Sequence, residues 1–135
     1  MELTNRMNSW ISTLGVHIAT SAKNGYPRII VTDTVEVKGE HIIVPLTDAQ
    51  FEFIKGNIAE NPQVAVAPGQ IGSIRAPYQF KGNASLSPNK LEILVNEIYC
   101  TKPGYEAGIR LDTIGFDAMA EFDESRWTDL APVNK

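Results

Sequence analysis

One acidic residue stands where a strand is expected to face the protein core. Asp33 interrupts an alternation formed by Val31, Val35 and Val37, and a carboxylate in an apolar interior is costly unless it is hydrogen-bonded. Such a carboxylate could hydrogen-bond a cofactor or a substrate. Alternatively, a β-bulge could turn Asp33 outward to solvent.

The start of a predicted helix near residue 47 is the second candidate for chemistry. Thr47 and Asp48 are both good N-cap residues, and a helix N-terminus has unpaired N–H groups and a partial positive charge that suit an anion. Thr47 and Gln50 add side-chain donors there. Phe53 lies off the apolar stripe of this helix, so we expect it to contact a ligand or a second copy of the chain, or to cover a neighbouring loop. The stripe consists of Phe51, Ile54 and Ile58.

The remaining reactive side chains form no pattern that indicates catalysis or metal binding. His17 and His41 are the only histidines, they lie on different predicted strands, and no cysteine or carboxylate pattern places further ligands beside them as metal sites require. Cys100 is the only cysteine and is expected to be a small buried hydrophobe. The segment at residues 69–72, Gly-Gln-Ile-Gly, lacks the strand–turn–helix setting of a nucleotide fingerprint. We therefore predict no metal site and no nucleophile.

Composition limits the class of protein and its partners. The 135 residues correspond to about one domain, so we treat residues 1–135 as a single domain. Twelve basic and sixteen acidic residues give a net charge of −4, which argues against a nucleic-acid partner and against an anionic membrane surface. A single cysteine, no signal-peptide pattern and no apolar run of about 20 residues favour the cytoplasm.

Periodicity predicts the elements that must position these residues. An apolar stripe at helical spacing predicts a first helix over residues 3–14, which ends at Gly15. The second helix runs from about residue 47 to Asn61-Pro62, and a third begins at Ser87-Pro88-Asn89. The apolar side of this third helix would be Leu91, Leu94, Val95 and Ile98. Strands are predicted over residues 16–20, 28–37, 41–46, 63–67, 78–84 and 111–122, and loops over 68–77 and 101–108.

Six strands with inserted helices and early hairpin turns predict a mainly β protein. The turns are at Lys23-Asn24-Gly25 and Lys38-Gly39-Glu40, and Asn-Gly tolerates the positive φ angles of a tight hairpin. The most economical arrangement is a small antiparallel barrel with helices attached.

Several short sequence segments, in their order along the chain, resemble the FMN-binding split-barrel family that contains the pyridoxamine-phosphate oxidases. The resemblance implies a six-stranded antiparallel split β-barrel with flanking helices and a homodimer with FMN at its interface. It covers nearly the whole chain. The segments are His17-Ile18-Ala19-Thr20, Asn24-Gly25-Tyr26-Pro27-Arg28, Ile42-Ile43-Val44-Pro45, Asn57-Ile58-Ala59-Glu60-Asn61-Pro62-Gln63-Val64, Phe80-Lys81-Gly82-Asn83-Ala84 and Trp127-Thr128-Asp129-Leu130-Ala131-Pro132.

The resemblance also implies a cofactor site. Residues 30–34 would face the flavin, residues 47–53 would surround its phosphate, and Trp127 from one subunit would close the site or pin the tail to the barrel. The residues implied at the cofactor are Arg28, Ile30, Val31, Thr32, Asp33, Thr34, Thr47, Gln50, Phe53 and Trp127.

One departure concerns the phosphate. Family members place a Lys or Arg in the first turn of the second helix, whereas this chain has residues 50–54, Gln-Phe-Glu-Phe-Ile, in that stretch. Glu52 would repel a phosphate unless it points away, and Arg28 and Lys55 are the nearest replacements in sequence. A ligand without a phosphate, or a different flavin pose, is therefore also open.

These observations lead to three alternatives for function. The first is an FMN-binding flavoprotein, a small oxidoreductase or electron-transfer protein with a small-molecule redox partner. The second is a non-enzymatic split-barrel module that has lost or altered its flavin site, and the third is a relative that binds deazaflavin or heme. Pyridoxamine-phosphate oxidase activity itself is not expected, because Asp129 stands where those oxidases carry a substrate-binding arginine.

Overall fold

Seven strands form one antiparallel sheet, and two helices pack against it. The computed structural model describes residues 2–72, 74–101 and 107–111. The helices are α1 (Asn5–Leu14) and α2 (Asp48–Glu60). The strands are β1 (Val16–Ser21), β2 (Pro27–Thr32), β3 (Glu36–Lys38), β4 (His41–Pro45), β5 (Gln63–Pro68), β6 (Gln70–Ile71), β7 (Ile74–Arg75), β8 (Tyr78–Ser87) and β9 (Lys90–Cys100).

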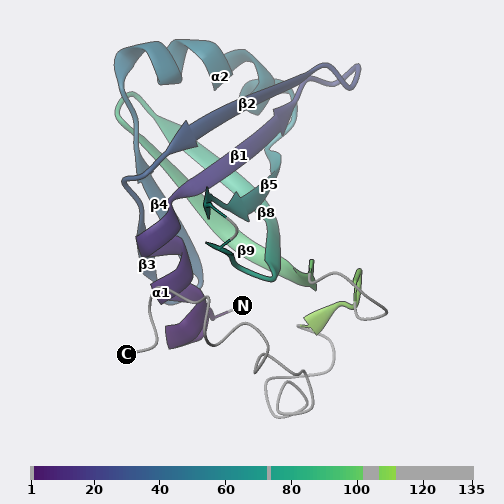
Figure 1. Cartoon of the computed structure of the whole chain (residues 1–135). Coiled ribbons are helices and arrows are strands. Elements are labelled where there is room, and N and C mark those ends of the chain that lie inside the picture. Colours follow the sequence, from purple (N-terminus) through teal and green to yellow (C-terminus); the bar gives the residue numbers. More distant parts are fainter. Residues whose placement is uncertain (1, 73, 102–106, 112–135) are drawn as a thin grey trace.

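A bend in one segment of the chain closes this sheet on itself. The strand order is β2-β1-β5-β8-β9-β4-β3, so β2 and β3 form its two edges. These edge strands follow each other in the chain, and only residues 33–35 separate them. Since that connection can bridge only about 14 Å, the sheet must curl until its edges approach each other, as Figure 1 shows. The predicted mainly β, antiparallel barrel with flanking helices is therefore confirmed.

The helices lie at different ends of the barrel (Figure 1). At the start of α1, the Thr4 hydroxyl oxygen accepts a hydrogen bond from the Met7 N–H at 3.2 Å, which satisfies one of the unpaired amides of a helix N-terminus. In α1, the residues of the predicted apolar stripe that are buried are Met7, Trp10 and Ile11. Helix α2 contacts β1, β2 and β8, and it buries Ile54 and Ile58.

The predicted third helix is wrong, because residues 90–100 form strand β9. Ser87 pairs with Lys90 across a tight turn, so the Pro88-Asn89 dipeptide is a hairpin turn rather than a helix start. The buried residues of β9 alternate along the strand and then shift phase at an irregularity opposite Lys81 and Gly82. That phase shift gives the apolar residues a spacing that imitates a helix over a short window. The buried apolar residues are Leu91, Ile93, Val95, Ile98 and Cys100, so the expected burial of Cys100 is confirmed.

Two other predicted boundaries differ from the structure. The single strand predicted over residues 28–37 is broken at residues 33–35 into β2 and β3, because β2 pairs with β1 whereas β3 pairs with β4. The loop predicted over residues 68–77 contains the small antiparallel pair β6–β7. The strand predicted over 111–122 lies outside the described residues except for Leu111, which is buried. Trp127 also lies outside them.

The part of the chain that the structure describes holds no helix long and apolar enough to cross a membrane.

The irregularity between β8 and β9 requires a glycine. A Cβ atom placed on Gly82 would overlap the carbonyl oxygen of Leu94, which is backbone and cannot move aside cheaply. Gly56 in α2, by contrast, has open space around the position that a Cβ atom would take. The two glycines therefore form a matched pair for substitution.

We expect Gly82→Ala to lower the free energy of unfolding by about 2–3 kcal/mol, because the methyl group forces the β8–β9 pair apart. Gly56→Ala should leave it unchanged or raise it by about 0.5–1 kcal/mol, since alanine is the better helix former. Urea unfolding followed by circular dichroism measures both. Equal effects of the two substitutions would contradict the tight approach at Gly82.

Candidate functional site

A groove lies between the bend after β2 and the turn from β4 into α2, and we call it the β2–α2 groove. Its volume is about 640 Å³, within the range of about 300–1,000 Å³ that is usual for small-molecule sites. It joins residues 31–34 to Thr47 and Gln50, which belong to the two stretches, 30–34 and 47–53, that the resemblance implied at the cofactor. The lining residues are Val31, Thr32, Asp33, Thr34, Pro45, Leu46, Thr47 and Gln50.

The start of α2 is held by a reciprocal pair of hydrogen bonds. The Thr47 hydroxyl oxygen accepts from the Gln50 N–H at 3.1 Å, and the Gln50 side-chain oxygen accepts from the Thr47 N–H at 3.0 Å. The Gln50 amide nitrogen also donates to the Val31 carbonyl at 3.5 Å. The side-chain groups expected to serve a ligand are thus engaged in capping the helix and in tying it to β2.

Asp33 lies in the bend and is exposed. It does not face the core, because residues 33–35 leave the strand pattern and the alternation from Val31 is broken there. The Thr34 hydroxyl donates to an Asp33 carboxylate oxygen at 3.3 Å, and the Thr34 N–H donates to the Thr32 hydroxyl at 3.1 Å. These local bonds hold the bend, and the Asp33 carboxylate lines the groove.

Three described residues implied at the cofactor, Arg28, Ile30 and Phe53, do not line this groove. Ile30 is 5% exposed, so its side chain belongs to the core beneath the groove. Arg28 donates from its guanidinium to the Phe53 carbonyl at 3.0 Å, and it stacks over the Phe53 ring at 4.9 Å from the ring centre. This pair joins β2 to the middle of α2.

Arg28 and Lys55 are the cationic residues nearest in sequence to the candidate phosphate position. Both line a second groove, of about 400 Å³, beside α2. Lys55 pairs there with Glu52 at 2.5 Å, so Glu52 lies away from the β2–α2 groove, which it does not line. The residues that line the second groove are Ala22, Asn24, Tyr26, Arg28, Glu52, Lys55, Gly56, Asn57 and Glu60.

A buried polar network that sequence reasoning missed fixes β2 relative to α2. The Asn57 side-chain nitrogen donates to the Thr20 hydroxyl oxygen at 3.1 Å and to the Tyr26 carbonyl at 3.3 Å. The Thr20 hydroxyl in turn donates to the Arg28 carbonyl at 2.9 Å. Asn57 and Thr20 are the polar residues of the described chain that are buried. The signal in the sequence was an asparagine on the apolar side of the predicted helix, next to Ile58.

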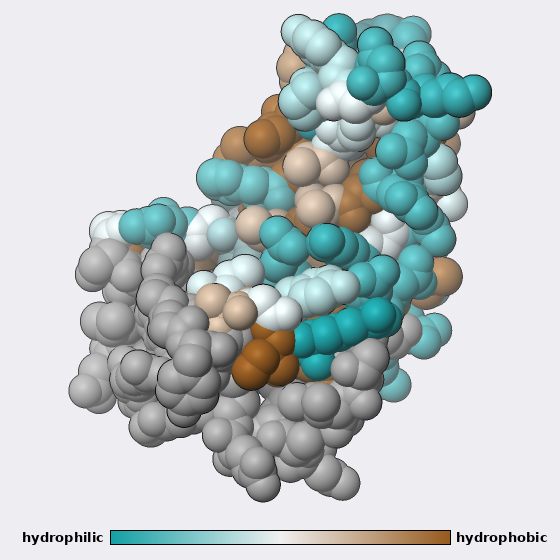
Figure 2. All heavy atoms as spheres, turned by 90° about the vertical axis from the view of Figure 1, so that its right-hand side faces the viewer, coloured by the Kyte–Doolittle hydropathy of each residue, from teal (hydrophilic) through white to brown (hydrophobic). Residues whose placement is uncertain are grey.

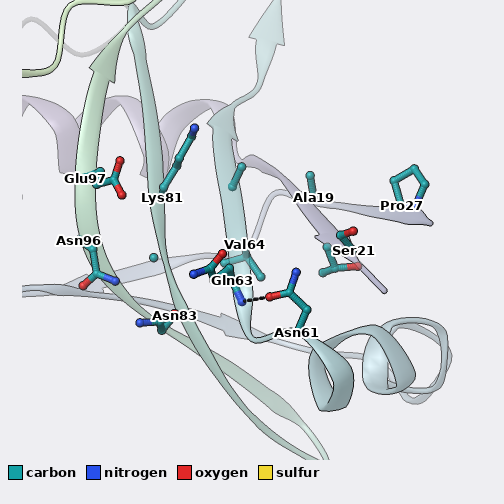
Figure 3. Close-up of a pocket in the computed structure, with 13 residues that line it drawn as sticks. Ala19, Ser21, Pro27, Asn61, Gln63, Val64, Lys81, Asn83, Asn96 and Glu97 are labelled. Carbon is teal, nitrogen blue, oxygen red and sulfur yellow. Dashed lines mark hydrogen bonds between the residues drawn. The ribbon is translucent and has the colours of Figure 1, made fainter. Parts of the chain in front are cut away.

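A third concavity, of about 430 Å³, lies over β1, β5, β8 and β9. Figure 3 shows the carboxamides of Asn61, Asn83 and Asn96 around it, with Lys81 and Glu97 on neighbouring strands. The Asn61 side-chain oxygen accepts from the Gln63 N–H at 3.1 Å. Within residues 2–72, 74–101 and 107–111, no group of three or more His, Cys, Asp or Glu side chains could hold a metal ion.

The comparisons with known proteins give a fold and no closer relationship. No protein-family model matches the sequence, and no curated protein matches it. HupZ from Group A Streptococcus has 21% identity and a TM-score of 0.60, covering 78% of this chain and 99% of HupZ. An FMN-binding protein from Syntrophomonas wolfei has 12% identity and a TM-score of 0.57, and the match covers 72% of this chain and 83% of that protein. HutZ, the heme storage protein from Vibrio cholerae, has 14% identity and a TM-score of 0.54, covering 74% and 95%.

The Asn57 network leads to a prediction about stability. Asn57→Ala leaves the buried Thr20 hydroxyl without one partner, so we expect the free energy of unfolding to fall by about 2 kcal/mol. Thr20→Val should cost about 1–2 kcal/mol, and the double variant should cost less than the sum, since both remove the same hydrogen bond.

Urea unfolding of the two single variants and the double variant gives the coupling energy. Asn96→Ala is the control, because Asn96 is exposed and its loss should change stability by less than about 0.5 kcal/mol. Strict additivity of the two buried substitutions would rule out the network as the link between β1, β2 and α2.

Proposed function

We propose that this chain, which has the fold of the pyridoxamine-phosphate-oxidase-like split-barrel proteins, binds FMN or a related flavin in the β2–α2 groove. It would serve as a small oxidoreductase or electron-transfer protein. The observation that carries the proposal is the groove itself, because it assembles residues 31–34 and residues 47–50 around one volume of suitable size. Bound flavin would supply the redox chemistry, and the protein would supply binding and orientation.

The lining chemistry suits a flat ring with polar edges. Val31, Pro45 and Leu46 offer apolar surface, and Thr32 and Thr34 offer hydroxyl groups. The Val31 carbonyl points into the space between β2 and α2, where Gln50 reaches it, and in an antiparallel pair the N–H of the same residue points to the same side. Backbone groups of β2 could therefore meet the ring edge.

The same lining favours a flavin over heme. Similar folds occur in an FMN-binding protein and in a heme storage protein, so the fold does not choose between them. Heme iron is usually held by His, Cys, Met or Tyr, and none of these residue types is among the described residues that line the groove. Of the two histidines, His17 is exposed on β1 and His41 lies 3.8 Å from Glu92.

We also propose that two copies of the chain form a homodimer that covers the groove. Tyr26, Ile29, Val31 and Phe53 are large apolar side chains with exposed fractions of 64%, 56%, 60% and 44%. They lie on β2, in the turn before it and on α2, and α2 contacts β2. In Figure 2, which shows one face of the molecule, hydrophobic residues also lie between hydrophilic ones below the α2 end. Exposed apolar surface gathered on neighbouring elements marks interaction sites.

A specific observation also favours the second candidate, a split-barrel module without flavin. Among the described residues, the β2–α2 groove is lined by the Asp33 carboxylate and by no lysine or arginine, so this part of the chain gives it no cationic side chain for a phosphate. A purified sample without flavin absorbance that also fails to bind added FMN would favour this candidate.

We expect Val31→Glu to weaken FMN binding at least about tenfold, because it places a charge where the ring would lie. Folding should be unaffected, since Val31 is already exposed. Quenching of FMN fluorescence on titration measures the affinity. Ile71→Glu is the control, since Ile71 is similarly exposed at 54% but lies on β6 outside the groove. Equal losses in the two variants would place the flavin elsewhere.

The dimer has its own test. Ile29→Glu introduces two like charges across the proposed interface, so sedimentation velocity should show a shift from dimer to monomer at micromolar concentration. FMN affinity should fall with it, by about tenfold, because each groove loses its cover. A wild-type chain that sediments as a monomer with FMN bound would refute the dimer and leave the groove standing.

A further inference from the structure

We infer that the β2–α2 groove recognises the uncharged ring portion of its flavin and gains nothing from the phosphate, so that riboflavin binds about as tightly as FMN. This inference rests on the proposed function and specifies its ligand. It is an inference about charge, and three features of the groove support it.

The first feature is the sign of the charge in the groove. Among the described residues that line it, Asp33 is the only one with a formal charge, and its carboxylate is exposed at the bend. A phosphate in the same groove would carry about −1.5 to −2 charges at neutral pH. Two like charges in a shared groove repel each other, and the repulsion is largest at low ionic strength.

The second feature is that the nearby cations serve other contacts. Arg28 binds the Phe53 carbonyl and covers the Phe53 ring, and Lys55 pairs with Glu52. Arg28 and Lys55 both line the second groove beside α2 and not the β2–α2 groove. A phosphate would have to break these contacts to obtain a cationic partner from the described part of one chain.

The third feature is the start of α2, where an anion would otherwise be favoured. The Gln50 N–H already donates to the Thr47 hydroxyl, and the Gln50 side chain is bonded at both ends, to Thr47 and to Val31. Asp48 places a carboxylate of the protein in the first turn, so the positive end of the helix dipole already has a negative charge beside it. The Thr47 and Gln50 side chains therefore have little left to offer a phosphate, and Asp48 opposes one by its charge.

The groups that remain are neutral. They are the backbone of β2, the apolar surface of Leu46, and the Thr32 and Thr34 hydroxyl oxygens. These hydroxyls already bond within the bend, but each oxygen can still accept a further hydrogen bond. Such groups bind an uncharged ring with hydrogen-bonding edges, and they do not distinguish a flavin that ends in a hydroxyl from one that ends in a phosphate.

The experiment compares the dissociation constants of riboflavin and FMN on the full chain, by fluorescence quenching at low and high salt. We expect the two constants to agree within about threefold, with FMN binding no weaker at high salt than at low salt. Asp33→Asn should strengthen FMN binding by up to about threefold, to the affinity of riboflavin, and leave riboflavin binding unchanged, because it removes one like charge. The asparagine oxygen can still accept the Thr34 hydrogen bond, so the bend should be retained.

Glu52→Gln is the matched control, since it changes the net charge equally but lies in the other groove, and it should not alter the ratio of the two constants. FMN binding more than tenfold tighter than riboflavin, with a loss of affinity at high salt, would overturn this inference and leave the proposed function intact. If neither flavin binds, the proposed function fails, and the inference fails with it.

Discussion

The fold depends on one constraint: a single segment of the chain, residues 27–38, supplies both edges of the sheet. Its bend at residues 33–35 needs space at the start of β1, where a Cβ on Gly15 would contact the Thr32 carbonyl oxygen and the Asp33 Cα. Gly15 also has a φ of 73°, which a glycine adopts without strain. Gly69 approaches the same junction, and its N–H donates to the Gly15 carbonyl at 2.9 Å. Two glycines thus allow the backbone to pass closely where the barrel closes.

The groove follows from that constraint through the topology. Beyond the bend, β3 pairs with β4, and β4 leads directly into α2. The bend and the start of α2 must therefore lie close together, although they are well separated in the chain. Asn57 adds a second tie, from α2 back to Thr20 and to the turn before β2. The walls of the groove are consequently parts of the barrel framework rather than free loops, which suits a site that must hold a rigid ring.

Local signals in the sequence predicted what local interactions decide. Thr47 and Gln50 form the cap that their types and spacing indicate, and the Gly25 N–H closes the first hairpin turn by donating to the Ala22 carbonyl. The third predicted helix failed because the apolar residues of β9 satisfy helical spacing only through the phase shift opposite Gly82, which depends on pairing with β8. The break after β2 is equally non-local, since two different partner strands impose it. The engagement of Arg28 with Phe53, distant in the sequence, has no sequence signal at all.

The contact between Gln50 and Val31 links the two ends of the site mechanically. The Gln50 side chain caps α2 through its oxygen and holds the Val31 carbonyl through its nitrogen, so a molecule that takes over the Val31 carbonyl frees the nitrogen end of this capping side chain. Occupancy of the groove and fraying of the first helical turn then become linked equilibria. Binding of a ligand to the Val31 carbonyl on β2 would therefore change the rate of amide hydrogen exchange at the start of α2.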